Sequence, residues 1–137
     1  MEKVFVDTSG WVALFVENDN HHKKAVSIFE DIKSSKALIH TSDYVIDETI
    51  TTILVRGGYK QSVFAGNALF TSRIIRIVHV SPDYLERAWE LYQKYKDKKF
   101  SFTDVTSLII MKDLNIRKAF GFDREFLEAG VELIGAG

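Results

Sequence analysis

Four acidic residues are placed along the chain in a way that suits chemistry assisted by a metal ion. Asp7 and Asp123 each directly follow a short apolar segment, and Asp104 opens a predicted helix. Glu48 lies about one and a half turns into another predicted helix. Several carboxylates in one place repel one another unless a cation is present. If the fold gathers these acids, we expect them to hold a cation.

A ligand set made only of oxygens favours Mg²⁺ or Mn²⁺ over zinc. The chain has no cysteine, which excludes thiolate zinc sites and cysteine nucleophiles. A bound Mg²⁺ or Mn²⁺ lowers the pKa of a coordinated water and neutralises charge that develops on a phosphate. The predicted reaction is therefore metal-assisted hydrolysis of a phosphodiester.

Each acid also has a structural interpretation that involves no catalysis. Asp7 and Asp123 are suited to cap the helices that follow them. Ser101 and Asp104 have the spacing of a capping box. Glu48 is explained equally well by a solvated helix face. The catalytic interpretation thus depends on whether the fold brings the four acids to one edge of a sheet.

The elements that would position the acids alternate between short apolar strands and longer helices. Strands are predicted at 4–6, 37–40, 74–80, 119–122 and 131–134. Helices are predicted at 11–17, 22–34, from the cap at 41–43 to 57–58, 61–72, 81–96 and 101–114, with a short helix between the last two strands. This alternation favours an α/β fold on a parallel sheet covered on both faces. Such sheets bind ligands beyond the carboxyl ends of their strands, which is where Asp7 and Asp123 lie.

The composition fits one compact domain that spans residues 1–137. Hydrophobic residues make up 46% and charged residues 27%, which allows a sizeable core. The net charge of −1 differs from that of a non-specific nucleic-acid coat, so any binding of nucleic acid is expected to be local. The absence of cysteine fits a reducing cytoplasm, and the longest apolar run, 11–16, is far too short for a membrane span. We therefore expect a cytoplasmic protein without a membrane segment.

Four segments, in this order, resemble the motifs of PIN domains: 4–9, which ends in Asp-Thr-Ser, then 45–48, 101–104 and 122–126. The resemblance implies a three-layer α/β/α fold with a five-stranded parallel sheet, and a ribonuclease that depends on Mg²⁺ or Mn²⁺. Small chains of this kind resemble VapC-type toxins of toxin–antitoxin pairs. That likeness implies a homodimer, an antitoxin that reaches into the acidic site, and a structured RNA substrate such as tRNA or rRNA.

The resemblance also implies roles for individual residues. The metal-holding and catalytic acids would be Asp7, Glu48, Asp104 and Asp123, with Asp7 and Asp104 in the most direct contact with the metal. Ser9 and Thr103 would orient carboxylates or water through their hydroxyls. Arg124, beside Asp123, is a candidate for a phosphate contact or for an ion pair within the site.

Two features depart from the family pattern or leave it ambiguous. Gly121 stands where the fourth motif usually has Thr or Ser, so one hydroxyl that would support the metal ligands is missing. Asp47 precedes Glu48, and the two side chains lie about 100° apart on a helix, so only one of them turns inward. The motif favours Glu48.

Basic and apolar residues suggest two further contacts. Lysines 94, 96, 98 and 99 form a small cluster that is explained either by phosphate contacts or by a solvated helix end. Helices over 44–55 and 61–70 carry many apolar residues for their length and are candidates for a dimer surface.

Three alternatives to the toxin stay open or are disfavoured. A PIN-type nuclease that processes RNA has the same sequence features, and only a neighbouring reading frame for an antitoxin separates the two roles. A catalytically silent PIN scaffold is disfavoured because all four acids are present. A receiver-like signalling domain would need a lysine after the fifth strand, where the chain has Ile134 and Gly135.

Overall fold

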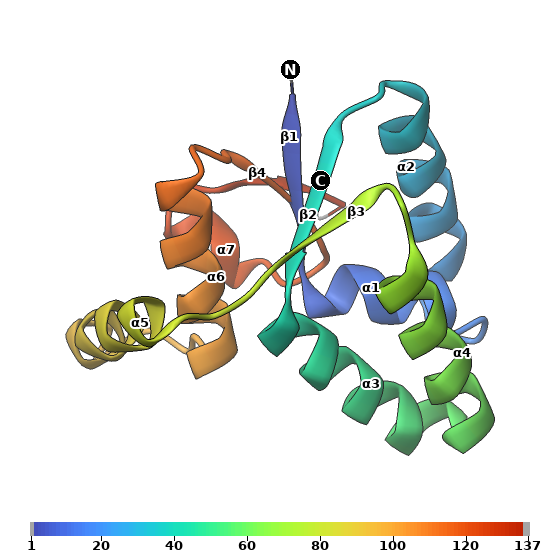
Figure 1. Ribbon diagram of the computed structural model, residues 1–137, viewed down its shortest axis with the longest axis horizontal. Coiled ribbons are helices and arrows are strands. Elements are labelled where there is room, and N and C mark those ends of the chain that lie inside the picture. The colour runs from blue at the N-terminus through green and yellow to red at the C-terminus, as the bar shows by residue number, and fades with distance from the viewer. Residues whose placement is uncertain (1, 136–137) are drawn as a thin grey trace.

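The computed structural model describes residues 2–135 and places a parallel sheet between helices (Figure 1). The strands are β1 (Lys3–Val6), β2 (Leu38–Ser42), β3 (Ile75–Val78), β4 (Lys118–Phe120) and β5 (Glu132–Ile134). Their order across the sheet is β3-β2-β1-β4-β5, and every neighbouring pair is parallel. The predicted α/β fold with a five-stranded parallel sheet is confirmed.

The helices fall close to their predicted ranges. They are α1 (Thr8–Phe15), α2 (His22–Ser34), α3 (Asp43–Gly57), α4 (Tyr59–Thr71), α5 (Pro82–Lys94), α6 (Phe102–Asp113) and α7 (Glu125–Glu128). In Figure 1, α5, α6 and α7 lie to one side of the strands, and α1, α2 and α4 lie to the other. Within residues 2–135, no helix combines the length and the apolarity needed to cross a membrane.

Side chains at the strand ends fix where several helices begin. The Oγ of Ser42 accepts a hydrogen bond from the Val45 amide at the start of α3, and the Oγ of Ser81 does the same for Tyr84 in α5. Ser42 also pairs with Val78 as the last residue of β2. The sequence prediction ended this strand at 40 because it assigned 41–43 only to the helix cap, whereas Ser42 serves both elements.

The core packs around β1, the central strand of the sheet. All side chains of β1 from Val4 to Val6 are buried, as expected for the central strand of a covered sheet. Trp11 of α1 is fully buried, and its Nε1 donates to the Oγ1 of Thr41 at 3.0 Å. Thr41 in turn donates to the carbonyl of Val6 at 3.0 Å. The backbone immediately before Asp7 is therefore held by α1 and β2 together.

The order in which the strands are added to the sheet reverses between β1 and β4. The chain leaves β1 toward β2 on one side and returns to its other side as β4. The Asp7 amide donates to the Phe120 carbonyl at 3.0 Å, so the ends of these two strands are tied to each other. Gly10 allows this approach, because a Cβ there would lie 2.7 Å from the Phe120 carbonyl oxygen. A ligand is expected in the crevice beyond such a switch point.

Candidate active site

A cleft of about 480 Å³ opens beyond β1 and β4 and is rich in carboxylates. The acids in its lining are Asp7, Glu48, Asp104, Asp123 and Glu125. All four acids singled out in the sequence thus come together from α3, α6 and the ends of two strands. The gathering at one sheet edge, on which the catalytic interpretation depended, is present.

Asp7 is held in place by its neighbour Ser9 and is 3% exposed. Its Oδ2 accepts hydrogen bonds from the Ser9 amide at 3.3 Å and from the Ser9 Oγ at 2.9 Å. Its Oδ1 is buried and has no hydrogen-bond partner among residues 2–135. Burial raises the pKa of Asp7 to about 6, although the hydrogen bonds from Ser9 oppose the change. Asp7 is therefore both the cap of α1 and a cleft acid with one uncommitted oxygen.

Like Asp7, Asp104 both caps a helix and lines the cleft, in this case at the start of α6. Its Oδ2 accepts from the Ser101 amide at 3.0 Å, and the Ser101 Oγ accepts from the Asp104 amide at 3.0 Å, which completes the predicted capping box. Burial, reinforced by the negative charge of Asp7, raises the pKa of Asp104 to about 7. Asp104 therefore caps α6 and lines the cleft at the same time.

Asp104, Asp123 and Glu125 form the tightest group of acids in the cleft. Each offers a carboxylate oxygen, and these oxygens lie within 4.8 Å of one another. Asp123 also accepts from the Glu125 amide at 3.0 Å. Burial, followed by the charge of Asp123, raises the pKa of Glu125. Glu125 is a cleft acid that the sequence prediction did not include, and the signal for it is its place in the fourth motif, two residues after Asp123.

These donors fit a hard divalent cation. The group of three carboxylates supplies the oxygen ligands that Mg²⁺ and Mn²⁺ prefer. Two residues of the lining, Asp7 and Thr8, also have a buried side-chain oxygen (Oδ1 and Oγ1) without a hydrogen-bond partner among residues 2–135. Such groups cost free energy unless they gain a partner, which a cation or its waters would provide.

The structure resolves the choice between Asp47 and Glu48. Glu48 is half-buried and lines the cleft, whereas Asp47 is exposed and does not. On α3, Ile46, Thr49 and Ile53 are buried against the core, which fixes the rotation of the helix. The motif-based preference for Glu48 agrees with this placement.

The predicted supporting residues do not all lie in the cleft. Ser9 lines the cleft, whereas Thr103 and Arg124 are absent from its lining. The Thr103 carbonyl accepts from the hydroxyls of Thr106 and Ser107 within α6, and Arg124 is exposed. Two cations that line the cleft are Arg56 and Lys99. Lys99 belongs to the predicted lysine cluster, while Arg56 was not singled out because it lies eight residues beyond Glu48.

The Ser9 hydroxyl explains the glycine at position 121. It donates to Asp7 and accepts from the Phe122 amide at 2.9 Å, so it joins the ends of β1 and β4. A Cβ on Gly121 would lie 2.8 Å from this Oγ and 3.2 Å from the Asp7 Cβ. A side chain at 121 would therefore compete with the hydroxyl that orients Asp7.

Gly121→Ala is expected to weaken Mn²⁺ binding by about tenfold or more, because it displaces the hydroxyl that orients a ligand. It should also lower the free energy of unfolding by about 1–3 kcal/mol through overpacking. Calorimetric titration with Mn²⁺ and urea unfolding would measure both effects. Gly57→Ala is the control, since the nearest atoms to its Cβ all belong to the Gln61 side chain, whose flexible end makes the tight contact. Unchanged Mn²⁺ affinity in the Gly121 variant would contradict this role of the glycine.

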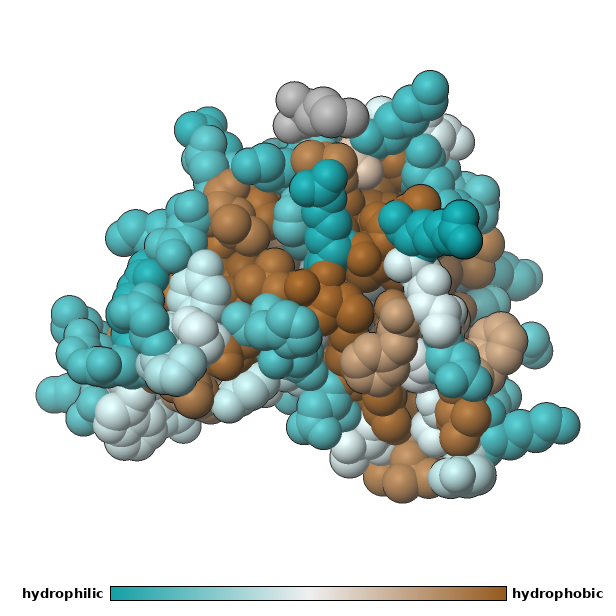
Figure 2. All heavy atoms as spheres, in the orientation of Figure 1, coloured by the Kyte–Doolittle hydropathy of each residue, from teal (hydrophilic) through white to brown (hydrophobic). Residues whose placement is uncertain are grey.

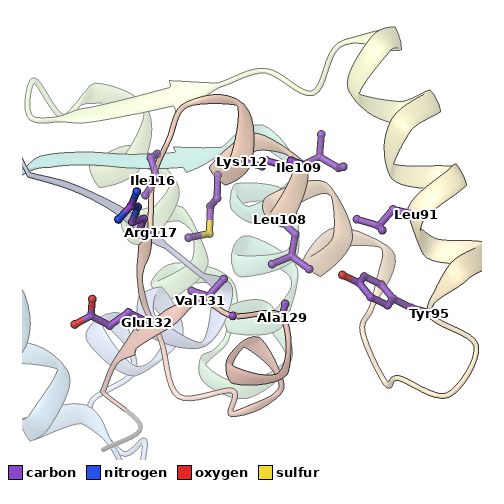
Figure 3. A pocket seen from close by; sticks show the side chains of 12 residues that line it. Leu91, Tyr95, Leu108, Ile109, Lys112, Ile116, Arg117, Ala129, Val131 and Glu132 are labelled. Carbon is purple, nitrogen blue, oxygen red and sulfur yellow. The ribbon is translucent and has the colours of Figure 1, made fainter.

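A larger hollow of about 630 Å³ lies between α5, α6 and β5 (Figure 3). Most residues labelled there are apolar, and the charged ones are Lys112, Arg117 and Glu132. One acid beside two cations has no means to hold a metal. Size alone would select this hollow, but the chemistry of the lining selects the acidic cleft.

Residues 4–132 match the family model of the PIN domain, and the chain belongs to this family. The chain is similar to the 23S rRNA-specific endonuclease VapC20 of Mycobacterium tuberculosis, with 35% identity over 127 residues that cover 93% of this chain and 94% of the relative. The predicted resemblance to PIN domains and to VapC-type ribonucleases is confirmed.

Solved structures agree with the fold. The crystal structure of M. tuberculosis VapC20, described as a sarcin–ricin loop cleaving toxin, has a TM-score of 0.85 and 35% identity, and the match covers 94% of this chain and 96% of that one. The structure of FitAcB from Neisseria gonorrhoeae has a TM-score of 0.67 and 14% identity, with 97% of each chain covered. At that identity the likeness concerns the fold alone.

Proposed function

We propose that this chain is an endoribonuclease that depends on a divalent metal, acts on the sarcin–ricin loop of 23S rRNA, and serves as the toxin of a toxin–antitoxin pair. The observation that carries the proposal is the cleft of five carboxylates beyond β1 and β4. The target is taken from VapC20, which is 35% identical and is named for cleavage of 23S rRNA. With a ribosomal substrate, the proposed location of the protein is the cytoplasm.

Asp104, Asp123 and Glu125 would hold the metal, with the uncommitted oxygen of Asp7 as a further ligand. When bound, Mg²⁺ or Mn²⁺ supplies a coordinated water of lowered pKa and neutralises charge on the scissile phosphate. Ser9 fixes the direction of the Asp7 carboxylate through its hydroxyl. Glu48 lines the same cleft from α3, where its carboxylate would accept hydrogen bonds from a water molecule and help to orient it.

The test uses an end-labelled RNA hairpin with the sarcin–ricin loop and a hairpin whose loop is scrambled. Each is incubated with protein and Mg²⁺ or Mn²⁺, beside EDTA and the Asp7→Asn variant. A cut in the authentic loop that disappears in both controls supports the proposal. Cleavage that survives EDTA contradicts metal dependence, and equal cleavage of both hairpins contradicts the target. Folded protein that cuts no RNA would be a silent scaffold.

A homodimer and an antitoxin are the proposed protein partners. Large apolar side chains are exposed on α3 and α4, at Leu54, Val55, Tyr59, Val63, Phe64 and Phe70. In Figure 2, brown patches appear in the lower right of the view, where these two helices lie. Val55 is 81% exposed and Tyr59 is 76% exposed, which is unusual for a surface that stays in water. We assign this surface to the dimer and the acidic cleft to a basic side chain of the antitoxin.

Val55→Lys/Phe70→Lys is expected to convert the dimer into a monomer at micromolar concentration, because both lysines would be buried without partners in the interface. Light scattering after size-exclusion chromatography would measure the mass. Trp89→Lys is the control, since Trp89 is 55% exposed on α5, outside this surface. A wild-type protein that is already monomeric would refute the dimer.

A further inference from the structure

Two cations lie among the acids of the cleft and come from different walls of it. Arg56 is near the carboxyl end of α3, and Lys99 is in the segment that joins α5 to α6. The two are the only basic residues in the described lining. Neither has a role in holding a metal, because cations repel it. Their position beside the acids therefore needs a separate explanation.

Arg56 continues a line of side chains along α3. Glu48, Thr52 and Arg56 follow one another at intervals of four residues, and all three line the cleft. At a rise of 1.5 Å per residue, Arg56 lies roughly 12 Å along the helix from Glu48. Arg56 thus lies further along α3 than Glu48, toward the carboxyl end of the helix.

The tip of Arg56 is held by an acid outside the cleft lining. Its Nη1 lies 2.9 Å from the Oδ2 of Asp19, in the loop between α1 and α2. Asp19 is anchored in turn, because its Oδ1 accepts from the His21 amide at 2.8 Å. The Arg56 side chain is still 43% exposed. A guanidinium has five donors, so one ion pair leaves most of the fork available to a planar anion such as phosphate.

Lys99 has the corresponding position on the other wall. It is exposed and lies close enough to Glu125 to interact with its charge. The adjacent Lys98 points elsewhere, to an ion pair with Glu128 at 3.5 Å. Of the predicted lysine cluster, Lys99 is thus the member that faces the cleft.

We infer that Arg56 and Lys99 bind the backbone phosphates on the two sides of the scissile one, so that the RNA strand crosses the acids from the end of α3 to the segment before α6. RNA is a polyanion, and carboxylates repel its phosphates wherever no metal or cation intervenes. The metal neutralises the centre of the path, and the two side chains neutralise its ends. This inference rests on the proposed ribonuclease function and adds the course of the strand.

The experiment measures the dissociation constant of the sarcin–ricin hairpin against KCl from about 50 to 200 mM, in Mg²⁺ and in an Asp104→Asn background that does not cut. Adding Arg56→Ala or Lys99→Ala should weaken binding about tenfold and reduce the slope of log Kd against log salt by about 0.7–0.9, as expected for one lost phosphate contact. Lys23→Ala, which changes an exposed lysine on α2, should alter neither quantity.

The variant Asp19→Asn distinguishes a phosphate-binding role of Arg56 from a role in bracing the loop between α1 and α2. It removes the ion pair with Arg56, while its amide oxygen still accepts from the His21 amide. If Arg56 binds phosphate, Asp19→Asn binds RNA as tightly as its parent or more tightly. If it weakens binding as much as Arg56→Ala does, Arg56 only braces the loop and the inference is overturned.

The remaining outcomes distinguish this inference from the proposed function. RNA binding with unchanged salt slopes in both alanine variants overturns the phosphate path alone. Absence of binding in folded protein at every salt concentration overturns the ribonuclease proposal and this inference with it. In the cleaving protein, Arg56→Ala should raise KM more than it lowers kcat, and Arg56→Lys should recover part of the loss.

Discussion

Asp104→Asn is expected to lower the rate of RNA cleavage by about a thousandfold or more and also to make the metal-free protein harder to unfold. The activity falls because a neutral amide is a poor substitute for an anionic ligand, and a loss of several kcal/mol in transition-state stabilisation costs a factor of ten for each 1.36 kcal/mol. The stability rises because burial raises the pKa of Asp104 to about 7, so its ionisation at pH 8 costs free energy that the amide avoids.

The expected gain in the free energy of unfolding is about 1–3 kcal/mol at pH 8 with EDTA, as each pKa unit corresponds to about 1.4 kcal/mol and part of the gain is lost to imperfect packing. The amide oxygen of Asn still accepts from Ser101, so the helix cap is kept. Asp113→Asn on the same helix is the control with the opposite sign, because Arg87 lowers the pKa of Asp113. An Asp104→Asn variant less stable than wild type would contradict the explanation.

The stabilisation of the protein by Mn²⁺ is expected to grow with pH. In the folded protein, burial raises the pKa of Asp7 to about 6 and of Asp104 to about 7, both from 3.8. Between pH 4 and pH 7 the folded state keeps protons that the unfolded state has released. Raising the pH through this window therefore destabilises the metal-free protein, and the loss is complete once both acids are ionised near pH 8.

Mn²⁺ competes with these protons for the same oxygens, so its affinity rises over the same window. At about 1 mM Mn²⁺ the rise in Tm should be several degrees larger at pH 8 than at pH 5.5, at roughly 4 °C for each kcal/mol in a chain of this size. Differential scanning calorimetry with EDTA references would measure it. The double variant Asp7→Asn/Asp104→Asn should lose both the shift and its pH dependence. A shift that is equal at the two pH values would refute the linkage.

The parts of the fold that follow local rules were predictable from the sequence. Caps at Ser81 and Ser101, the glycine pair at 57–58, and continuous apolar strands are local signals, and the helices they bound fall close to their predicted ranges. The convergence of Asp7 and Asp123 was predictable for a related reason, because parallel strands bring their carboxyl ends to one edge. Asp7 directly follows β1, whereas Asp123 lies three residues after β4, which ends at Phe120 and not at the predicted residue 122. The sequence therefore predicts the candidate site at this edge of the sheet.

Other site residues depend on packing that the sequence does not display. Whether Asp47 or Glu48 turned inward was set by the burial of Ile46 and Ile53, which fixes the rotation of α3. Arg56 enters the cleft only because α3 runs along it for two further turns. Thr103 sits one residue before Asp104 on α6, so its side chain is turned about 100° from that acid and lies outside the cleft lining.

Because Asp104 both caps α6 and lines the cleft, a mutation at this position can remove activity without removing the fold. One of its oxygens closes the first turn of α6, and an asparagine at this position would preserve that contact while removing the charge. The codons of aspartate and asparagine differ by a single base, so one mutation would separate the active ribonuclease proposed here from a folded, inactive copy. For the toxin proposed here, a cell that has lost the antitoxin would have a short genetic route to survival, and Asn at position 104 is the expected result. Alanine is also one base away from aspartate, but it would remove the helix cap together with the charge, so the inactive copy would be less stable than the Asn variant.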